Sequence, residues 1–119
     1  QDGIKKGNVL SVAQVAGIMG AKSCSQIIPL CHPINISKVS VKLDLAENAY
    51  EGPLCCSVNI EAQVKCKGET GVEMEALSAV STAALTVFDM CKAVSKNMRI
   101  EGIRVVEKTG GKSGNWKIE

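Results

Sequence analysis

The chain has 119 residues, of which 45% are apolar and only 3% aromatic. This length fits one small domain with a core of aliphatic side chains. The net charge of +2 is too small for the phosphate attraction of a duplex-binding protein, and three aromatic residues are too few for a base-stacking platform, so we expect no nucleic-acid partner. We also expect no membrane span and no secretory signal, because no run approaches about 18 apolar residues and no charged leader precedes a cleavage site.

The first predicted element is a helix that Asn8 caps and that Gly20 and Lys22 weaken or close. Its apolar residues recur at helical spacing: Val9, Val12, Val15, Ala16 and Met19. Apolar and polar residues then alternate over residues 39–45 and again over residues 58–66, which predicts two half-buried antiparallel strands. The connection between the strands holds the turn-forming residues Asn48, Gly52 and Pro53.

Residues 71–95 contain no proline and predict the long helix of the domain. One stripe holds its apolar side chains: Leu77, Val80, Ala84, Phe88 and Cys91. Thr70 and Glu73 have the S/T-x-x-E spacing of a capping box at its start. A third strand is expected over residues 100–106. Helices crossing one face of an antiparallel sheet give an α+β two-layer sandwich, for which a ferredoxin-like arrangement is the natural candidate.

The six cysteines include no C-x-x-C pair, and Cys56 and Cys66 lie on the apolar phase of a predicted strand. We therefore expect reduced, mostly buried thiols and a reducing compartment. His32 is the only histidine and has no second Cys or His at zinc-ligand spacing, so no metal site is expected.

Lys92 lies only about 40° around the long helix from Phe88, at the edge of the apolar stripe. Asp89 precedes it by three residues and can pair with it. Two interpretations stay open. Lys92 is either a surface lysine that extends along the apolar face and forms an ion pair, or one partner of an acid and base pair whose pKa values are tuned by partial burial.

Glu75 and Lys92 are seventeen positions apart on the same predicted helix, hence about 25 Å apart at 1.5 Å per residue. This distance is longer than a nucleotide triphosphate can readily bridge while keeping both ends in one reaction centre. If both residues serve one site, they must come from two subunits.

The tail over residues 108–114, Lys-Thr-Gly-Gly-Lys-Ser-Gly, is not a P-loop, because Val106 stands where that motif requires its first glycine. Lys108, Lys112 and the glycines between them form either a phosphate-binding nest or a flexible tail. His32 lies between two prolines, so it is either a pH-sensitive group on a rigid segment or a satisfied structural histidine.

Five segments in this order closely resemble the cyclic pyranopterin monophosphate synthase family, the MoaC family of molybdenum cofactor biosynthesis. They are Lys-Gly-Asn at 6–8, Ile-Pro-Leu-Cys-His-Pro at 28–33, Thr-Gly-Val-Glu-Met-Glu-Ala at 70–76, Phe-Asp-Met-Cys-Lys-Ala-Val at 88–94 and the tail at 108–114. The resemblance runs from about residue 5 to residue 117.

The resemblance implies a lyase that converts 3′,8-cyclo-7,8-dihydro-GTP to cyclic pyranopterin monophosphate with release of pyrophosphate, without redox chemistry or a cofactor. It also implies a ferredoxin-like subunit in a homohexamer, a trimer of dimers with the active site at a dimer interface. The catalytic positions it implies are Asp89, Lys92 and Lys6. The substrate-binding positions it implies are Leu30, Cys31, His32, Thr70, Glu73, Met74, Glu75 and Lys108.

Two departures from the family accompany the resemblance. The family carries an N-terminal segment with a pocket arginine, whereas this chain begins at Gln1, so we expect a single domain over residues 1–119 that lacks that segment. Asn8 stands where the family usually has Asp. The alternative function is a non-catalytic ferredoxin-like module that binds a nucleotide phosphate through its tail, or a structural oligomer that has lost its activity. The expected location is the cytoplasm, or the mitochondrial matrix in a eukaryote.

Overall fold

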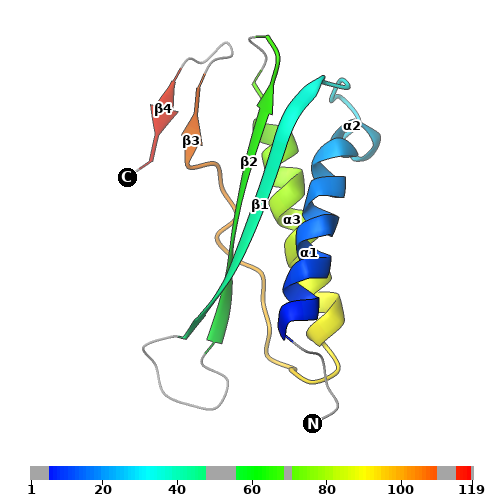
Figure 1. Ribbon diagram of the computed structural model, residues 1–119, viewed down its shortest axis with the longest axis vertical. Coiled ribbons are helices and arrows are strands. Elements are labelled where there is room, and N and C mark those ends of the chain that lie inside the picture. Colours follow the sequence, from blue (N-terminus) through cyan, green and yellow to red (C-terminus); the bar gives the residue numbers. More distant parts are fainter. Residues whose placement is uncertain (1–5, 48–55, 69–70, 110–114, 119) are drawn as a thin grey trace.

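The computed structural model describes residues 6–47, 56–68, 71–109 and 115–118. The helices are α1 (Lys6–Lys22), α2 (Cys24–Ile27) and α3 (Glu73–Cys91). The strands are β1 (Ile36–Glu47), β2 (Cys56–Cys66), β3 (Glu107–Lys108) and β4 (Trp116–Lys117). In Figure 1, α1 and α3 lie side by side and run in opposite directions, beside the long β1 and β2 strands.

The β1 and β2 strands form an antiparallel pair that confirms both predicted strands and extends each of them. Val41 lies opposite Ala62 and Leu43 opposite Ile60, so one face of the pair is apolar. The alternate positions carry polar pairs such as Lys42 and Glu61. The predicted loop residues Asn48, Gly52 and Pro53 lie outside the described residues.

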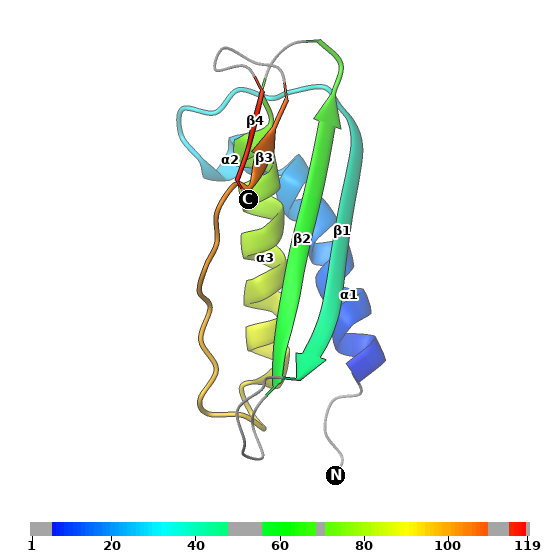
Figure 2. The same cartoon turned by 90° about the vertical axis from the view of Figure 1, so that its left-hand side faces the viewer.

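Both long helices cover the apolar face of this sheet, with α1 against β1 and α3 against β2. Figure 2 views the molecule from the sheet, with α1 and α3 lying behind β1 and β2. The fold is therefore the expected α+β sandwich with helices on one face of an antiparallel sheet, and it is compatible with a ferredoxin-like arrangement.

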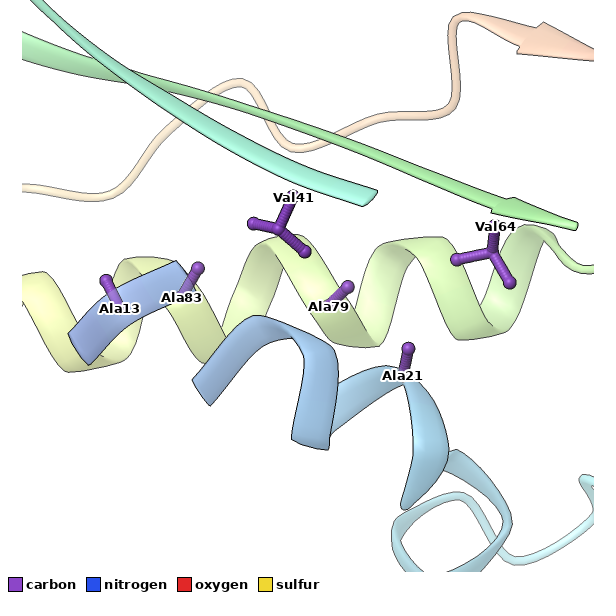
Figure 3. Close-up of a cluster of buried hydrophobic side chains, with 6 residues drawn as sticks. All are labelled: Ala13, Ala21, Val41, Val64, Ala79 and Ala83. Atoms are coloured by element: carbon purple, nitrogen blue, oxygen red, sulfur yellow. The ribbon is translucent and has the colours of Figure 1, made fainter. Parts of the chain in front are cut away.

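The core combines two strand valines, which the alternating pattern predicted, with helix alanines, which the helical pattern did not single out. Its buried members are Ala13, Ala21, Val41, Val64, Ala79 and Ala83. Figure 3 shows the two valines pointing from the strands toward the alanines of α1 and α3. A Cβ atom added at Gly20 would lie 2.9 Å from the Ser78 carbonyl oxygen, so α1 and α3 approach closely there.

Because of this close approach, the buried face of α1 differs from the predicted apolar stripe. Val9 is buried, but Val12, Val15 and Met19 are exposed, because the helix turns its small residues toward α3. Gly20 lies inside the helix against α3 and does not end it, whereas α1 does end at Lys22, as predicted. The predicted cap at Asn8 is wrong, because α1 already begins at Lys6.

The long helix is shorter than the predicted 71–95, and the capping-box prediction is wrong. Its N-cap residue is Val72, which makes no side-chain cap, and Glu73 is the first helical residue instead of the third. Thr70 lies outside the described residues. By length and composition alone, α3 could cross a membrane, but such a helix is also typical of a domain core, and here Ala79 and Ala83 pack in the core.

The predicted third strand over residues 100–106 is also wrong. Strand β3 begins only at Glu107 and pairs with β4 in a separate small sheet. The reason lies in Gly102, whose φ of 73° breaks an extended conformation in the middle of the apolar run. Ile100 and Ile103 remain exposed as a result.

Candidate active site

The residues expected to form the site fall into two groups at opposite ends of α3. One group, which we call the α3-start cluster, consists of Cys31, Glu73, Glu75 and Lys108. The other is the Asp89–Lys92 pair at the end of the helix. Because α3 is helical from Glu73 to Cys91, the predicted distance of about 25 Å between Glu75 and Lys92 applies in the structure.

An ion pair joins β3 to the start of α3. The Nζ atom of Lys108 lies 3.3 Å from Oε2 of Glu73, and the Lys108 side chain is only 9% exposed, against 37% for Glu73. Gly71 lies beneath the pair: a Cβ atom there would overlap the Glu73 carboxylate and lie 2.9 Å from Cε of Lys108. The absence of a side chain at Gly71 thus leaves room for the pair.

Glu75 is 3% exposed and is the only buried charged or polar residue in the described part of the chain. It lies close enough to Cys31 for its charge to act on that thiol. Desolvation, the hydrogen bond from Cys24 and the Glu75 charge together raise the pKa of the Cys31 thiol. This end of the molecule therefore combines a buried carboxylate, a thiol and a shielded lysine.

The rest of the expected substrate segment lies at the surface. Leu30 is 91% exposed and has little contact with its own chain. His32 and Met74 are exposed as well, on the segment after α2 and on the first turn of α3. An apolar side chain as open as Leu30 is available to a ligand or to another subunit.

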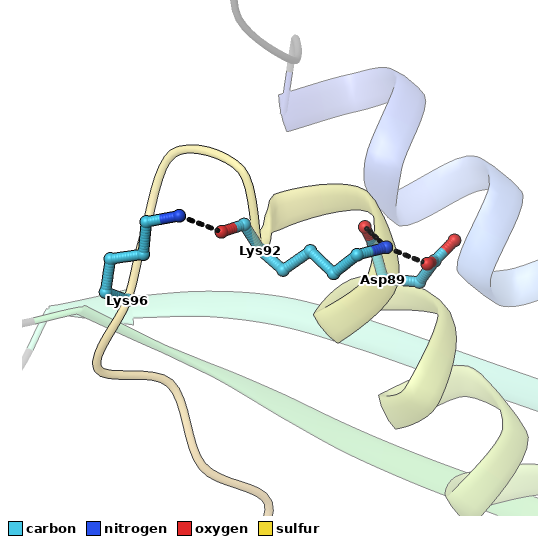
Figure 4. Close-up of polar contacts among 3 residues, drawn as sticks. All are labelled: Asp89, Lys92 and Lys96. Atoms are coloured by element: carbon cyan, nitrogen blue, oxygen red, sulfur yellow. Dashed lines mark hydrogen bonds and ion pairs between the residues drawn. The ribbon is translucent and has the colours of Figure 1, made fainter.

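At the other end of α3, Lys92 forms an ion pair with the Asp89 carboxylate (Figure 4). Its Nζ also donates to the Asp89 carbonyl oxygen at 3.3 Å, and Lys96 donates to the Lys92 carbonyl oxygen at 3.5 Å. Lys92 and Asp89 are 59% and 71% exposed, so the partial burial considered for this pair is not found in the single chain. The surface ion pair is the interpretation that the single chain supports.

Lys6 is the first residue of α1, at the end of the helix pair where α3 ends (Figure 1). The antiparallel packing of the helices therefore brings the backbone of Lys6 to the same end as the Asp89–Lys92 pair. The structure does not describe the Lys6 side chain, and Thr70 and Lys112 lie outside the described residues.

Sequence reasoning missed two residues that contact the α3-start cluster. Cys24 donates a hydrogen bond to Cys31, and Gly71 supports the Glu73–Lys108 pair. No spacing rule points to Cys24, because it becomes a neighbour of Cys31 only through the turn after α2. Gly71 lies in the segment 70–76 that resembles the family, but its role depends on how β3 packs against the start of α3.

A hollow of about 430 Å³ lies elsewhere, between α1 and the edge of the sheet, and contains none of the expected site residues. The described residues contain no group of three or more His, Cys, Asp or Glu side chains placed to hold a metal ion. Among the cysteines that the structure describes, Cys24, Cys31 and Cys91 are free thiols.

Comparison with known proteins gives the same family as the motifs. Residues 1–111 match the sequence profile of the MoaC family. The chain belongs to the MoaC family. Three relatives carry the name cyclic pyranopterin monophosphate synthase. The protein of Chloroflexus aggregans is 57% identical over 98% of this chain and 67% of its own length, and that of Corynebacterium glutamicum is 58% identical over 98% and 70%. The protein of Parvibaculum lavamentivorans is 54% identical over 100% and 71%.

This MoaC-family chain thus spans about two thirds of the length of the C. aggregans relative. The family match confirms the resemblance that the five segments carried and covers the first four of them completely.

Proposed function

We propose that this chain converts 3′,8-cyclo-7,8-dihydro-GTP to cyclic pyranopterin monophosphate and releases pyrophosphate, as a lyase of molybdenum cofactor biosynthesis. The observation that carries the proposal is the synthase name shared by bacterial relatives at 54–58% identity over nearly the whole chain. The same relatives favour an enzyme over a non-catalytic phosphate-binding module. A bacterial source would place the enzyme in the cytoplasm, and a eukaryotic one in the mitochondrial matrix.

Asp89, Lys92 and Lys6 are the proposed catalytic residues. Opening a purine imidazole ring and building a pterin requires several proton transfers at nitrogen and carbon, which amines and a carboxylate can mediate. The Asp89–Lys92 pair supplies one of each, and its exposed position leaves both groups accessible to a ligand. Lys6 begins the neighbouring helix at the same end.

The α3-start cluster is the proposed substrate-binding part. Lys108 provides a positive charge toward the triphosphate, with Glu73 holding its ammonium group in position. Leu30, Cys31, His32, Met74 and Glu75 are proposed to contact the substrate, together with Thr70. Lys112 and the glycines of the tail are proposed to stabilise the charge that develops on departing pyrophosphate.

The distance of about 25 Å between the two groups supports a site shared between two copies of the chain. In such a dimer, the α3-start cluster of one copy would face the Asp89–Lys92 pair of the other. The exposed apolar residues of α1, Val12, Val15 and Met19, offer surface for association between copies. We propose a homohexamer assembled as a trimer of such dimers.

Pyrophosphate release from the cyclised GTP substrate tests the proposed function. Purified chain should release pyrophosphate and form the cyclic monophosphate, and Lys92→Ala protein should serve as the inactive control. Substrate binding without pyrophosphate release would favour the non-catalytic module.

A further inference from the structure

Two thiols meet at the exposed substrate segment, residues 29–33: Cys31 is one of its proposed substrate contacts, and Cys24 lies next to Cys31. Neither thiol has a part in the proposed proton transfers. The Sγ atom of Cys24 donates to the Sγ atom of Cys31 over 3.7 Å. Both thiols are free. Because the S–S distance of a disulfide is about 2.05 Å, the sulfur atoms need to approach by only about 1.6 Å to bond.

We propose that Cys24 and Cys31 form a redox-active dithiol. A small disulfide oxidises this pair to an intramolecular disulfide. The new bond moves the substrate segment out of its binding conformation. The pairing itself rests on the sulfur geometry. Its effect on turnover rests on the proposed function, because Leu30, Cys31 and His32 belong to the proposed substrate contacts.

The two thiols differ in access, which sets the order of the steps. Cys24 lies in α2 and is 1% exposed, whereas Cys31 is half-buried on the segment that follows. An oxidant from solution therefore reaches Cys31 first. Cys24 is already in hydrogen-bond contact with Cys31 and can act as the second, resolving thiol.

The exchange balances with a low-molecular-weight disulfide such as oxidised glutathione as the oxidant. The Cys31 thiolate attacks one sulfur, the S–S bond of the oxidant breaks, and the first small thiol leaves and takes up a proton. The Cys24 thiolate then attacks the Cys31 sulfur and expels the second small thiol. Two electrons and two protons pass from the protein to the oxidant, and one protein disulfide forms.

The neighbours of Cys31 make this a slow response. Desolvation, the Cys24 hydrogen bond and the charge of Glu75 raise the pKa of Cys31, so the reactive thiolate is scarce near neutral pH. Attack of Cys31 on a disulfide is therefore slower near neutral pH than at higher pH. Any movement of Cys31 also changes the surroundings of the buried Glu75 carboxylate.

Mass spectrometry of the oxidised chain tests the pairing directly. Trypsin cleaves after Lys22 and Lys38, so both thiols fall in one peptide over residues 23–38. After equilibration with oxidised and reduced glutathione and alkylation, this peptide should lack two hydrogen atoms and carry no alkyl group. Pyrophosphate release should fall by about 10²-fold, the cost of misplacing a positioning group by ~1 Å, and dithiothreitol should restore it.

Two variants separate the proposed pair from the other thiols. Cys24→Ser should be active when reduced, and oxidation should stop at a glutathione adduct on Cys31. Cys91→Ser should behave as the parent in both measurements. If Cys24→Ser does not fold, Cys24→Ala replaces it, and the parent peptide still decides the pairing.

A glutathione adduct on Cys31 as the end product of the parent chain would overturn the dithiol. A disulfide that leaves substrate affinity and turnover unchanged would overturn its effect on the site. If the reduced chain releases no pyrophosphate, the proposed function is contradicted. The mass of the peptide over residues 23–38 would still show whether Cys24 and Cys31 form a disulfide.

Discussion

Lys92 occupies a position where its loss should cost the fold little. Its ammonium group binds the exposed Asp89 carboxylate and carbonyl oxygen, and Lys92 is the C-cap residue of α3. Exposed pairs of this kind contribute about 0–1 kcal/mol to stability, and a cation at a helix C-terminus contributes about as much. A large loss of activity on removing Lys92 would therefore report on chemistry and not on folding.

Lys92→Ala should keep the circular dichroism spectrum and Tm of the parent within a few degrees while turnover falls by at least ~10²-fold, as expected for a lost acid or base. Lys96→Ala is the matched control, because Lys96 also lies at this end of α3 but only donates to the Lys92 carbonyl oxygen. Turnover within a few-fold of the parent for Lys92→Ala would remove this residue from the mechanism.

The Cys31 thiol should react slowly at neutral pH and faster as the pH rises. Its pKa is raised by desolvation, the Cys24 hydrogen bond and Glu75, and only the thiolate attacks iodoacetamide. Glu75→Gln removes the negative charge, lowers the pKa of Cys31 and should speed alkylation at pH 8. The rate is followed on the peptide over residues 23–38. An unchanged rate in Glu75→Gln would mean that the Glu75 charge does not act on Cys31.

Among the elements, α1 and α3 approach each other closely because both present small residues at their contact. Periodicity could predict both helices but not the face that α1 buries. An amphipathic pattern points to large apolar side chains, whereas Ala13 and Gly17 leave less surface and permit a closer approach. Whether a helix buries its large or its small residues depends on the element that packs against it. The sequence of the helix alone does not reveal that element.

Gly20→Ala tests this contact. Alanine favours a helix by about 1 kcal/mol over glycine, but its Cβ atom would lie 2.7 Å from Cβ of Thr82, and overpacking typically costs about 1–3 kcal/mol. We expect a net loss of stability, measured as a lower urea midpoint. Ser11→Ala, at an exposed position of the same helix, should change the midpoint little. A stabilised Gly20→Ala protein would contradict the close packing.

Strand β3 carries Lys108, whose ammonium group forms an ion pair with Glu73 at the start of α3. Lys108→Ala should weaken calorimetric binding of the triphosphate substrate more than binding of the cyclic monophosphate product, which lacks the pyrophosphate. Raising the salt concentration should mimic part of this effect. Glu73→Gln, which keeps the lysine, should preserve most of the difference. Equal losses for substrate and product in Lys108→Ala would reverse the proposed orientation of the substrate.

For the whole molecule, the sequence predicted the order of the two long helices and the two long strands and the two-layer arrangement, but not the short helix α2. It failed where a distant partner or one backbone angle decides the structure. Glu73 pairs with Lys108 instead of capping α3, and Gly102 interrupts the predicted third strand. Most of the proposed site residues came from the family resemblance, whereas helix position alone singled out Asp89 and Lys92. The structure adds the contacts within each of the two groups that α3 separates.

This separation leads to the central claim, that the active site is completed by a second copy of the chain. Within one chain, α3 keeps Glu75 and Lys92 about 25 Å apart. Both the Asp89–Lys92 pair and Leu30 remain open to solvent. Each end of the chain therefore offers half of the groups that the proposed reaction needs.

Subunit mixing tests this claim most directly. Glu75→Gln and Lys92→Ala proteins, each inactive alone, are combined under conditions in which mass spectrometry demonstrates exchange of subunits. Mixed dimers contain one site with both residues intact, so pyrophosphate release should return to about a quarter of the parent value for random exchange between two-site dimers. Absence of any recovered activity despite proven exchange would contradict a site shared between two copies.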